Sequence, residues 1–209
     1  MQSPFTFKHT APTTGTGKQP ALFLLHGMGS HEGDLPNLVQ DFTATHHIFS
    51  LRGPIVQPPG YAFFTIEEEG KPDRAIFDKV LVYIQSFIRE AVHVYDLDSA
   101  RLTVVGFSQG AVLAQTLGLT LIPSLHGVVA LSGYMPEFVK SQYVKQSVEK
   151  QHVFISHGDY DYVIPSQSGV ESKEYFESLG ANVTFKTYPD GHGVTPENQH
   201  DLTAFLHTL

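Results

Sequence analysis

Short apolar runs alternate with longer amphipathic segments along most of the chain. Five runs have the length and the continuous hydrophobicity of buried strands, at residues 21–27, 47–52, 101–106, 127–133 and 152–158. Residues 182–188 alternate between apolar and polar side chains, which predicts an edge strand. Strands that alternate with helices form a mostly parallel sheet covered on both faces, so the pattern predicts an α/β fold.

The segments between these strands have helical periodicity. In the longest of them, apolar residues recur every three or four positions from Phe77 to Tyr95, which gives a single stripe for the core. Shorter helical patterns cover residues 34–45, 109–121, 166–179 and 196–209. Gly180 follows one of these helices directly and suits the left-handed position that commonly ends a helix.

Two stretches show neither the hydrophobic pattern of a strand nor that of a helix. Residues 10–20 predict a loop that joins a first strand to the sheet. Residues 54–73 form the only long irregular stretch, and loops of this length are usually functional or disordered. Tyr61, Phe63 and Phe64 favour an ordered, apolar flap, although the pattern does not decide whether it is a mobile lid.

Composition narrows the class of protein. A chain of 209 residues with 41% apolar and 16% charged residues is expected to form a single globular domain over residues 1–209. The formal net charge of −8 argues against a nucleic-acid partner. With no cysteine in the sequence, disulfides, thiolate metal sites and a cysteine nucleophile are excluded. The N-terminus lacks the apolar run of a signal peptide, so we expect a cytoplasmic protein without stable membrane association.

Polar residues and glycines follow the predicted strands at their carboxyl ends, where open parallel sheets bind their ligands. These segments are His-Gly-Met-Gly from residue 26, Gly-Phe-Ser-Gln-Gly from 106, Ser-Gly-Tyr from 132 and His-Gly-Asp-Tyr-Asp from 157. His192 follows the sixth strand. Because these segments share one edge of the sheet, the sequence predicts a site there.

The Gly-x-Ser-x-Gly segment predicts a nucleophile, since its glycines tolerate the strained turn that exposes the Ser108 hydroxyl. A serine needs a base and a carboxylate that orients the base, and Asp161 and His192 follow in the order Ser, Asp, His that α/β-hydrolases share. For the oxyanion we expect two backbone N–H donors, from Gln109 at a helix N-terminus and from Met28 between two glycines.

The segments LHGMGS, LRGP, GFSQGA, ALSGYMP, HGDYDYVIP and PDGHGV resemble those of the phospholipase/carboxylesterase family, which includes the acyl-protein thioesterases. They appear in the family's order and span roughly residues 21–207. The resemblance implies an α/β-hydrolase fold, a Ser-His-Asp triad, no cofactor, no metal, and activity on carboxylic esters or thioesters.

Asp159 is the alternative to Asp161 as the triad carboxylate. The family spacing favours Asp161, which also lies further from the strand end, where the chain can fold back under the loop of His192. We expect Asp159 to tie the turn to its own backbone, as aspartates in turns tend to do. His26 and His157 each precede a glycine at a strand end and are interpreted as structural hydrogen-bonding groups.

The predicted substrate is a small-molecule ester with a short to medium acyl chain of roughly two to eight carbons, because the flap is short and rich in aromatic residues. The side chains expected to contact it are Tyr61, Phe63, Phe64, Tyr134, Met135 and Ile164.

Several alternatives stay open. An acyl thioesterase or lysophospholipase would use the same mechanism, and a ligand-binding homologue would keep the fold without catalysis. A metal-dependent hydrolase is disfavoured because the chain lacks an H-E-x-x-H or similar ligand spacing. The oligomeric state also stays open, a homodimer included.

Overall fold

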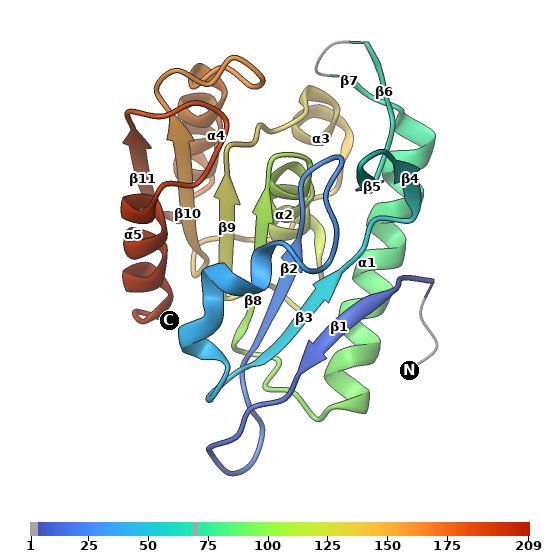
Figure 1. Ribbon diagram of the computed structural model, residues 1–209, viewed down its shortest axis with the longest axis vertical. Helices are drawn as coiled ribbons and strands as arrows, with labels where there is room; N and C mark the ends of the chain where they lie inside the picture. Colours follow the sequence, from blue (N-terminus) through green and yellow to red (C-terminus); the bar gives the residue numbers. More distant parts are fainter. Residues whose placement is uncertain (1–3, 69–70) are drawn as a thin grey trace.

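The computed structural model describes residues 4–68 and 71–209. A seven-stranded sheet forms its centre, in the order β1-β3-β2-β8-β9-β10-β11 (Figure 1). The strands are β1 (Phe7–Thr10), β2 (Ala21–Leu25), β3 (His47–Leu51), β8 (Leu102–Phe107), β9 (Gly127–Leu131), β10 (His152–Gly158) and β11 (Asn182–Tyr188). Only β1 pairs antiparallel in this sheet; the other pairings are parallel, and β11 lies at the edge as predicted.

Helices cover both faces of the sheet. They are η1 (Leu35–Phe42), α1 (Arg74–Val94), α2 (Gln109–Thr120), α3 (Glu137–Gln142), α4 (Gln167–Ser178) and α5 (Pro196–Leu206). Apolar side chains of α1 to α4 share one core cluster, whereas those of η1 and α5 share another on the opposite face. Among the described residues, no helix is both long and apolar enough to cross a membrane.

The packing of strand β2 on both faces explains why its sequence contains no polar residue. Phe23 and Leu25 point into the core under α1 and α2, while Leu22 and Leu24 point into the core under η1 and α5. Each face of a central parallel strand is covered by helices, so both sets of side chains are apolar. The continuous apolar runs of the sequence are therefore explained by the two-sided core.

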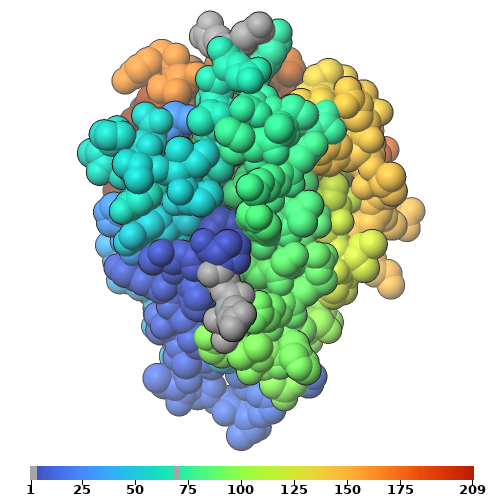
Figure 2. Space-filling model, turned by 90° about the vertical axis from the view of Figure 1, so that its right-hand side faces the viewer, coloured from blue at the N-terminus to red at the C-terminus, as the bar shows by residue number. Residues whose placement is uncertain are grey.

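The flap predicted over residues 54–73 contains more regular structure than its sequence indicates. Two short hairpins occur in its described part: β4 (Ile55–Gln57) with β5 (Gly60–Ala62), and β6 (Ile66–Glu68) with β7 (Lys71–Pro72). Residues 69 and 70 lie outside the described residues. In Figure 2, α1 lies between the β4–β5 hairpin and the segment that carries α3.

Two helical predictions need correction. The segment predicted as a helix over 34–45 is a 3₁₀ helix over Leu35–Phe42, with non-helical dihedrals at Val39. Its buried residues are Leu35, Val39 and Phe42. Their spacing indicates a helical segment but does not distinguish the hydrogen bonds of a 3₁₀ helix from those of an α-helix. Helix α3 was not predicted, because a six-residue helix with a single buried residue, Val139, has no periodic signal.

Candidate active site

Ser108 occupies the sharp turn between β8 and α2. Its φ of 52° and ψ of −116° lie in a region that few non-glycine residues adopt, and such backbone strain persists only where the surroundings impose it. A Cβ at Gly106 would lie 2.1 Å from the carbonyl oxygen of Gly110, and a Cβ at Gly110 would lie 1.9 Å from that of Leu25. The two glycines therefore let the strand, the turn and the helix approach closely enough to raise Ser108 above the sheet.

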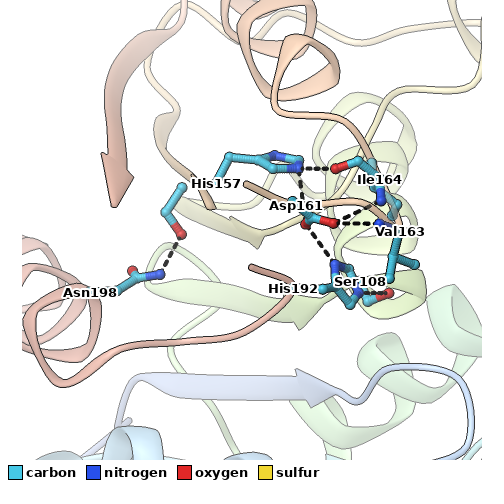
Figure 3. A network of polar contacts seen from close by, with 8 residues as sticks. Ser108, His157, Asp161, Val163, Ile164, His192 and Asn198 are labelled. Atoms are coloured by element: carbon cyan, nitrogen blue, oxygen red, sulfur yellow. Dashed lines mark hydrogen bonds and ion pairs between the residues drawn. The ribbon is translucent and has the colours of Figure 1, made fainter. Parts of the chain in front are cut away.

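The side chains of Ser108, His192 and Asp161 form one hydrogen-bonded chain (Figure 3). His192 Nε2 lies 2.9 Å from Ser108 Oγ, and His192 Nδ1 lies 2.7 Å from Asp161 Oδ2. The carboxylate is fully buried, while the imidazole is 15% exposed. Asp161 accepts a hydrogen bond from the Nδ1–H group of His192. Nε2 of the same imidazole is therefore unprotonated, and its lone pair is directed at the serine hydroxyl.

Each member of this chain comes from a different strand end. Ser108 follows β8, Asp161 follows β10 and His192 follows β11. The loop that carries His192 crosses close above β10, since a Cβ at Gly158 would lie 2.1 Å from the Gly191 carbonyl oxygen. The parallel strands of one sheet thus bring together residues that are up to 84 positions apart in sequence.

The turn after β10 depends on Asp161 itself. Its Oδ1 accepts hydrogen bonds from the backbone N–H groups of Val163 and Ile164, both at 2.9 Å. The side chain of Asp159 is exposed and makes no hydrogen bond within the described residues, although its backbone N–H donates to the Tyr188 carbonyl. The expectation that the Asp159 carboxylate ties the turn is therefore wrong, because the backbone of the turn is directed at the buried Asp161.

His157 lies behind Asp161 and is fully buried. Its Nε2 donates to the Ile164 carbonyl oxygen at 2.8 Å and lies 3.4 Å from Asp161 Oδ2. Burial lowers the pKa of this imidazole, which favours its neutral form. His157 thus holds the turn around Asp161, which agrees with the structural role expected for it.

Two backbone N–H groups next to Ser108 are free to bind an anion. The N–H of Gln109 is at the first turn of α2, and that of Met28 lies in the loop after β2. Neither donates a hydrogen bond to any other described residue. A helix N-terminus also carries a partial positive charge, which favours the developing charge of an oxyanion.

A small apolar cavity of about 140 Å³ adjoins Ser108. It is lined by Met28, Phe64, Ile66, Ser108, Gln109, Val112, Tyr134, Val163 and Ile164. Of the side chains expected to contact a substrate, Phe64, Tyr134 and Ile164 are at this cavity. Val112 was missed by the sequence analysis, although its position one helical turn after Ser108 could have indicated it.

The other three side chains of that expected set do not line this cavity. Tyr61 packs under the Arg52 guanidinium, which lies 4.5 Å from its ring centre. Phe63 is fully buried in the core, with its ring 4.8 Å from that of His26. Met135 lines a separate cavity of about 560 Å³ that shares the Tyr134 side chain with the first. Phe63 and Phe64 thus both belong to the core, and Phe64 also lines the cavity beside Ser108 whereas Phe63 does not, a distinction that composition alone does not reveal.

Comparison with known proteins shows the family to which this chain belongs. The profile of the phospholipase/carboxylesterase family matches residues 13–209. The chain belongs to that family. It is 31% identical over 160 residues to acyl-protein thioesterase 1 homolog 1 of Dictyostelium discoideum, a match that covers 75% of this chain and 70% of the relative. It is 29% identical over 217 residues to acyl-protein thioesterase 1 of Saccharomyces cerevisiae, covering 90% and 93% of the two chains.

Solved structures establish the fold of this family member. The carboxylesterase of Bacillus cereus superposes with a TM-score of 0.87 at 24% identity, over 98% of this chain and 94% of the other. Esterase PE8 superposes with a TM-score of 0.86 at 25% identity, over 98% of each chain. The chain therefore has the α/β-hydrolase fold and is a serine hydrolase of the phospholipase/carboxylesterase family, as the sequence segments indicated.

Proposed function

We propose that this phospholipase/carboxylesterase family member is a serine carboxylesterase that hydrolyses short- to medium-chain carboxylic esters. The observation that carries the proposal is the hydrogen-bonded chain of Ser108, His192 and Asp161 beside two free N–H donors and a small apolar cavity. The strained turn at Ser108 adds support, since such strain clusters at active sites.

In the proposed mechanism, Ser108 Oγ attacks the acyl carbon while its proton passes to His192 Nε2. The tetrahedral oxyanion is held by the N–H groups of Met28 and Gln109. Asp161 stabilises the imidazolium, which then donates its proton to the leaving alcohol as the carbon–oxygen bond breaks. Water, deprotonated by His192, next attacks the acyl-enzyme and releases the carboxylic acid and the free serine.

The size of the cavity supports the acyl length. A cavity of about 150 Å³ holds benzene in a protein interior, and the cavity beside Ser108 has a similar volume of about 140 Å³. An acyl chain of about six carbons would fill it. Longer chains would have to pass Tyr134 to enter the neighbouring cavity.

An acyl thioesterase of the same mechanism is the second candidate. It is favoured by the two relatives named acyl-protein thioesterase, which match this chain over most of its length. The leaving thiol would receive its proton from His192 as an alcohol does, so the triad does not discriminate between the two substrates.

The test is a panel of p-nitrophenyl esters and of matched thioesters with acyl chains of graded length, measured as kcat/KM. We expect ester turnover to peak at or below roughly eight carbons. An organophosphonate should label the chain once, on the peptide that contains Ser108, and Ser108→Ala should abolish labelling and turnover, by a factor on the order of 10⁶. Labelling of another serine would overturn the proposal. A steady rise of kcat/KM to palmitoyl thioesters would favour the thioesterase.

A further inference from the structure

The two N–H groups proposed as the oxyanion hole, one in the loop after β2 and one at the start of α2, belong to residues whose neighbourhoods contact one common segment, residues 53–64, which comprises Gly53 and the first part of the flap. We call these residues the scaffold segment. Its backbone pairs with the loop after β2: the Gly29 N–H donates to the Tyr61 carbonyl, and the Tyr61 N–H donates to the Ser30 carbonyl, both at 2.8 Å. Two buried polar side chains, which the proposed mechanism does not use, extend this contact.

His26 is the first of these side chains, and its exposed fraction is 1%. The Gly53 N–H donates to His26 Nε2 at 3.0 Å, so this nitrogen carries no proton. The proton is then on Nδ1, which donates to the Gly27 carbonyl oxygen at 2.7 Å. Burial lowers the pKa of His26, which keeps this neutral tautomer. The hydrogen bond from Gly53 of the scaffold segment therefore selects the tautomer in which Nδ1 carries the proton and binds the Gly27 carbonyl.

The bond from His26 to Gly27 orients the Met28 donor. The Gly27 carbonyl and the Met28 N–H belong to a single peptide group, which is planar and trans. Its C=O and N–H point in opposite directions, so a carbonyl held by the buried His26, and also by the Ser30 N–H at 3.2 Å, leaves the Met28 N–H directed away from the imidazole. Met28 itself lines the cavity that adjoins Ser108.

Gln109 is the second side chain, with an exposed fraction of 4%. Its Oε1 accepts from the Phe63 N–H at 2.6 Å, and its Nε2 donates to the Phe64 carbonyl at 2.7 Å. The Ser108 carbonyl accepts from Ala111 and Val112 within α2, which orients the Ser108–Gln109 peptide group. One residue thus supplies a backbone donor for the oxyanion and binds the scaffold segment through its side chain.

We propose that His26 and Gln109 are positioning residues that hold the Met28 and Gln109 N–H groups at a set separation through the scaffold segment. The inference rests on the proposed function, since it assumes that these N–H groups bind the oxyanion. An oxyanion hole needs donors that are in place before the charge develops. Three buried hydrogen bonds to the scaffold segment, together with the buried bond from His26 to Gly27, provide that rigidity.

The test compares His26→Phe and Gln109→Met, which keep side-chain bulk and remove the hydrogen bonds. Displacing catalytic groups by about 1 Å lowers turnover by about 100-fold, so we expect kcat to fall by about that factor while KM changes less than about threefold. The Ki of a trifluoromethyl ketone, whose adduct with Ser108 carries the oxyanion, should rise by the same factor as kcat/KM falls. A purely structural role would lower the melting temperature without this split.

Gln115→Met is the matched control. Gln115 lies on the same helix, is fully buried, and its amide has no hydrogen-bond partner among the described residues. We expect its kcat to stay within about twofold of the parent. An equal loss in Gln115→Met would assign the effect to helix packing and overturn the inference.

Two further outcomes separate the inference from the proposed function. If Ser108→Ala is inactive while folded His26→Phe and Gln109→Met keep kcat and Ki within threefold of the parent, the inference fails and the proposed function stands. If Ser108→Ala retains turnover, both fail. Because the two positions are tested independently, either variant that folds decides the result.

Discussion

Replacement of Asp161 by asparagine should inactivate the protein while leaving its fold intact. The two carboxylate oxygens have different partners: Oδ1 accepts from the Val163 and Ile164 N–H groups, and Oδ2 accepts from His192 Nδ1. An amide nitrogen cannot accept from two N–H donors, so the asparagine oxygen must take the Oδ1 position. Its NH₂ group then faces His192.

That orientation selects the wrong tautomer of the catalytic base. His192 would accept from the amide at Nδ1 and carry its proton on Nε2, where it cannot take the proton of Ser108. We expect kcat to fall by ~10⁴-fold, equivalent to about 5.5 kcal/mol of transition-state stabilisation. The asparagine oxygen still accepts the hydrogen bonds from the Val163 and Ile164 N–H groups, but it is a neutral acceptor instead of a charged one. The free energy of unfolding should therefore fall by only about 1–2 kcal/mol.

The assay is steady-state hydrolysis of a p-nitrophenyl ester beside thermal unfolding of the same preparation. Asp159→Asn is the matched control, because this neighbouring side chain is exposed and makes no hydrogen bond among the described residues. We expect its kcat within about twofold of the parent and an unchanged melting temperature. If Asp161→Asn kept kcat within tenfold, or if Asp159→Asn lost activity instead, the assignment of the carboxylate would be refuted.

Three further predictions follow from other parts of the structure. Tyr134→Ala should join the cavities of about 140 and 560 Å³ and raise the kcat/KM ratio of twelve-carbon to six-carbon esters by at least about tenfold. Burial of only two of the additional methylenes contributes about 1.6 kcal/mol, which is enough for this factor. An unchanged ratio would contradict the prediction. Exhaustive chelation should leave the rate unchanged, because backbone N–H groups polarise the carbonyl; a loss restored by Zn²⁺ or Mn²⁺ would count against the mechanism. Two hydrogen bonds from Arg52 lower the pKa of Glu32 from 4.5 to about 2, so their contribution to stability is complete above about pH 4.5 and is lost as the pH falls towards 2. Urea unfolding across this range should show a flatter pH dependence for Glu32→Gln, and equal slopes would contradict the assignment.

The sequence by itself determined the elements that have a strong period and the segments that follow them. Buried parallel strands are continuous apolar runs, so β2, β8, β9 and β10 were visible without coordinates. The left-handed residue after α4 was visible as well, because Gly180, with a φ of +86°, is the residue type that adopts this conformation without steric penalty. Local signals of this kind depend only on neighbouring residues in the chain.

The tertiary structure decided the features that depend on contacts between distant segments. The sequence placed Phe63 and Phe64 together in an apolar flap expected to contact the substrate, yet both rings are buried in the core, and Phe64, unlike Phe63, also lines the cavity beside Ser108. It named Gln109 for its backbone N–H, whereas the hydrogen bonds of its side chain to residues 45 and 46 positions away appear only in three dimensions. The composition and the hydrophobic periodicity of a segment show how much of it will be buried. They do not show which distant segment packs against each side chain, and that contact sets the direction of the side chain.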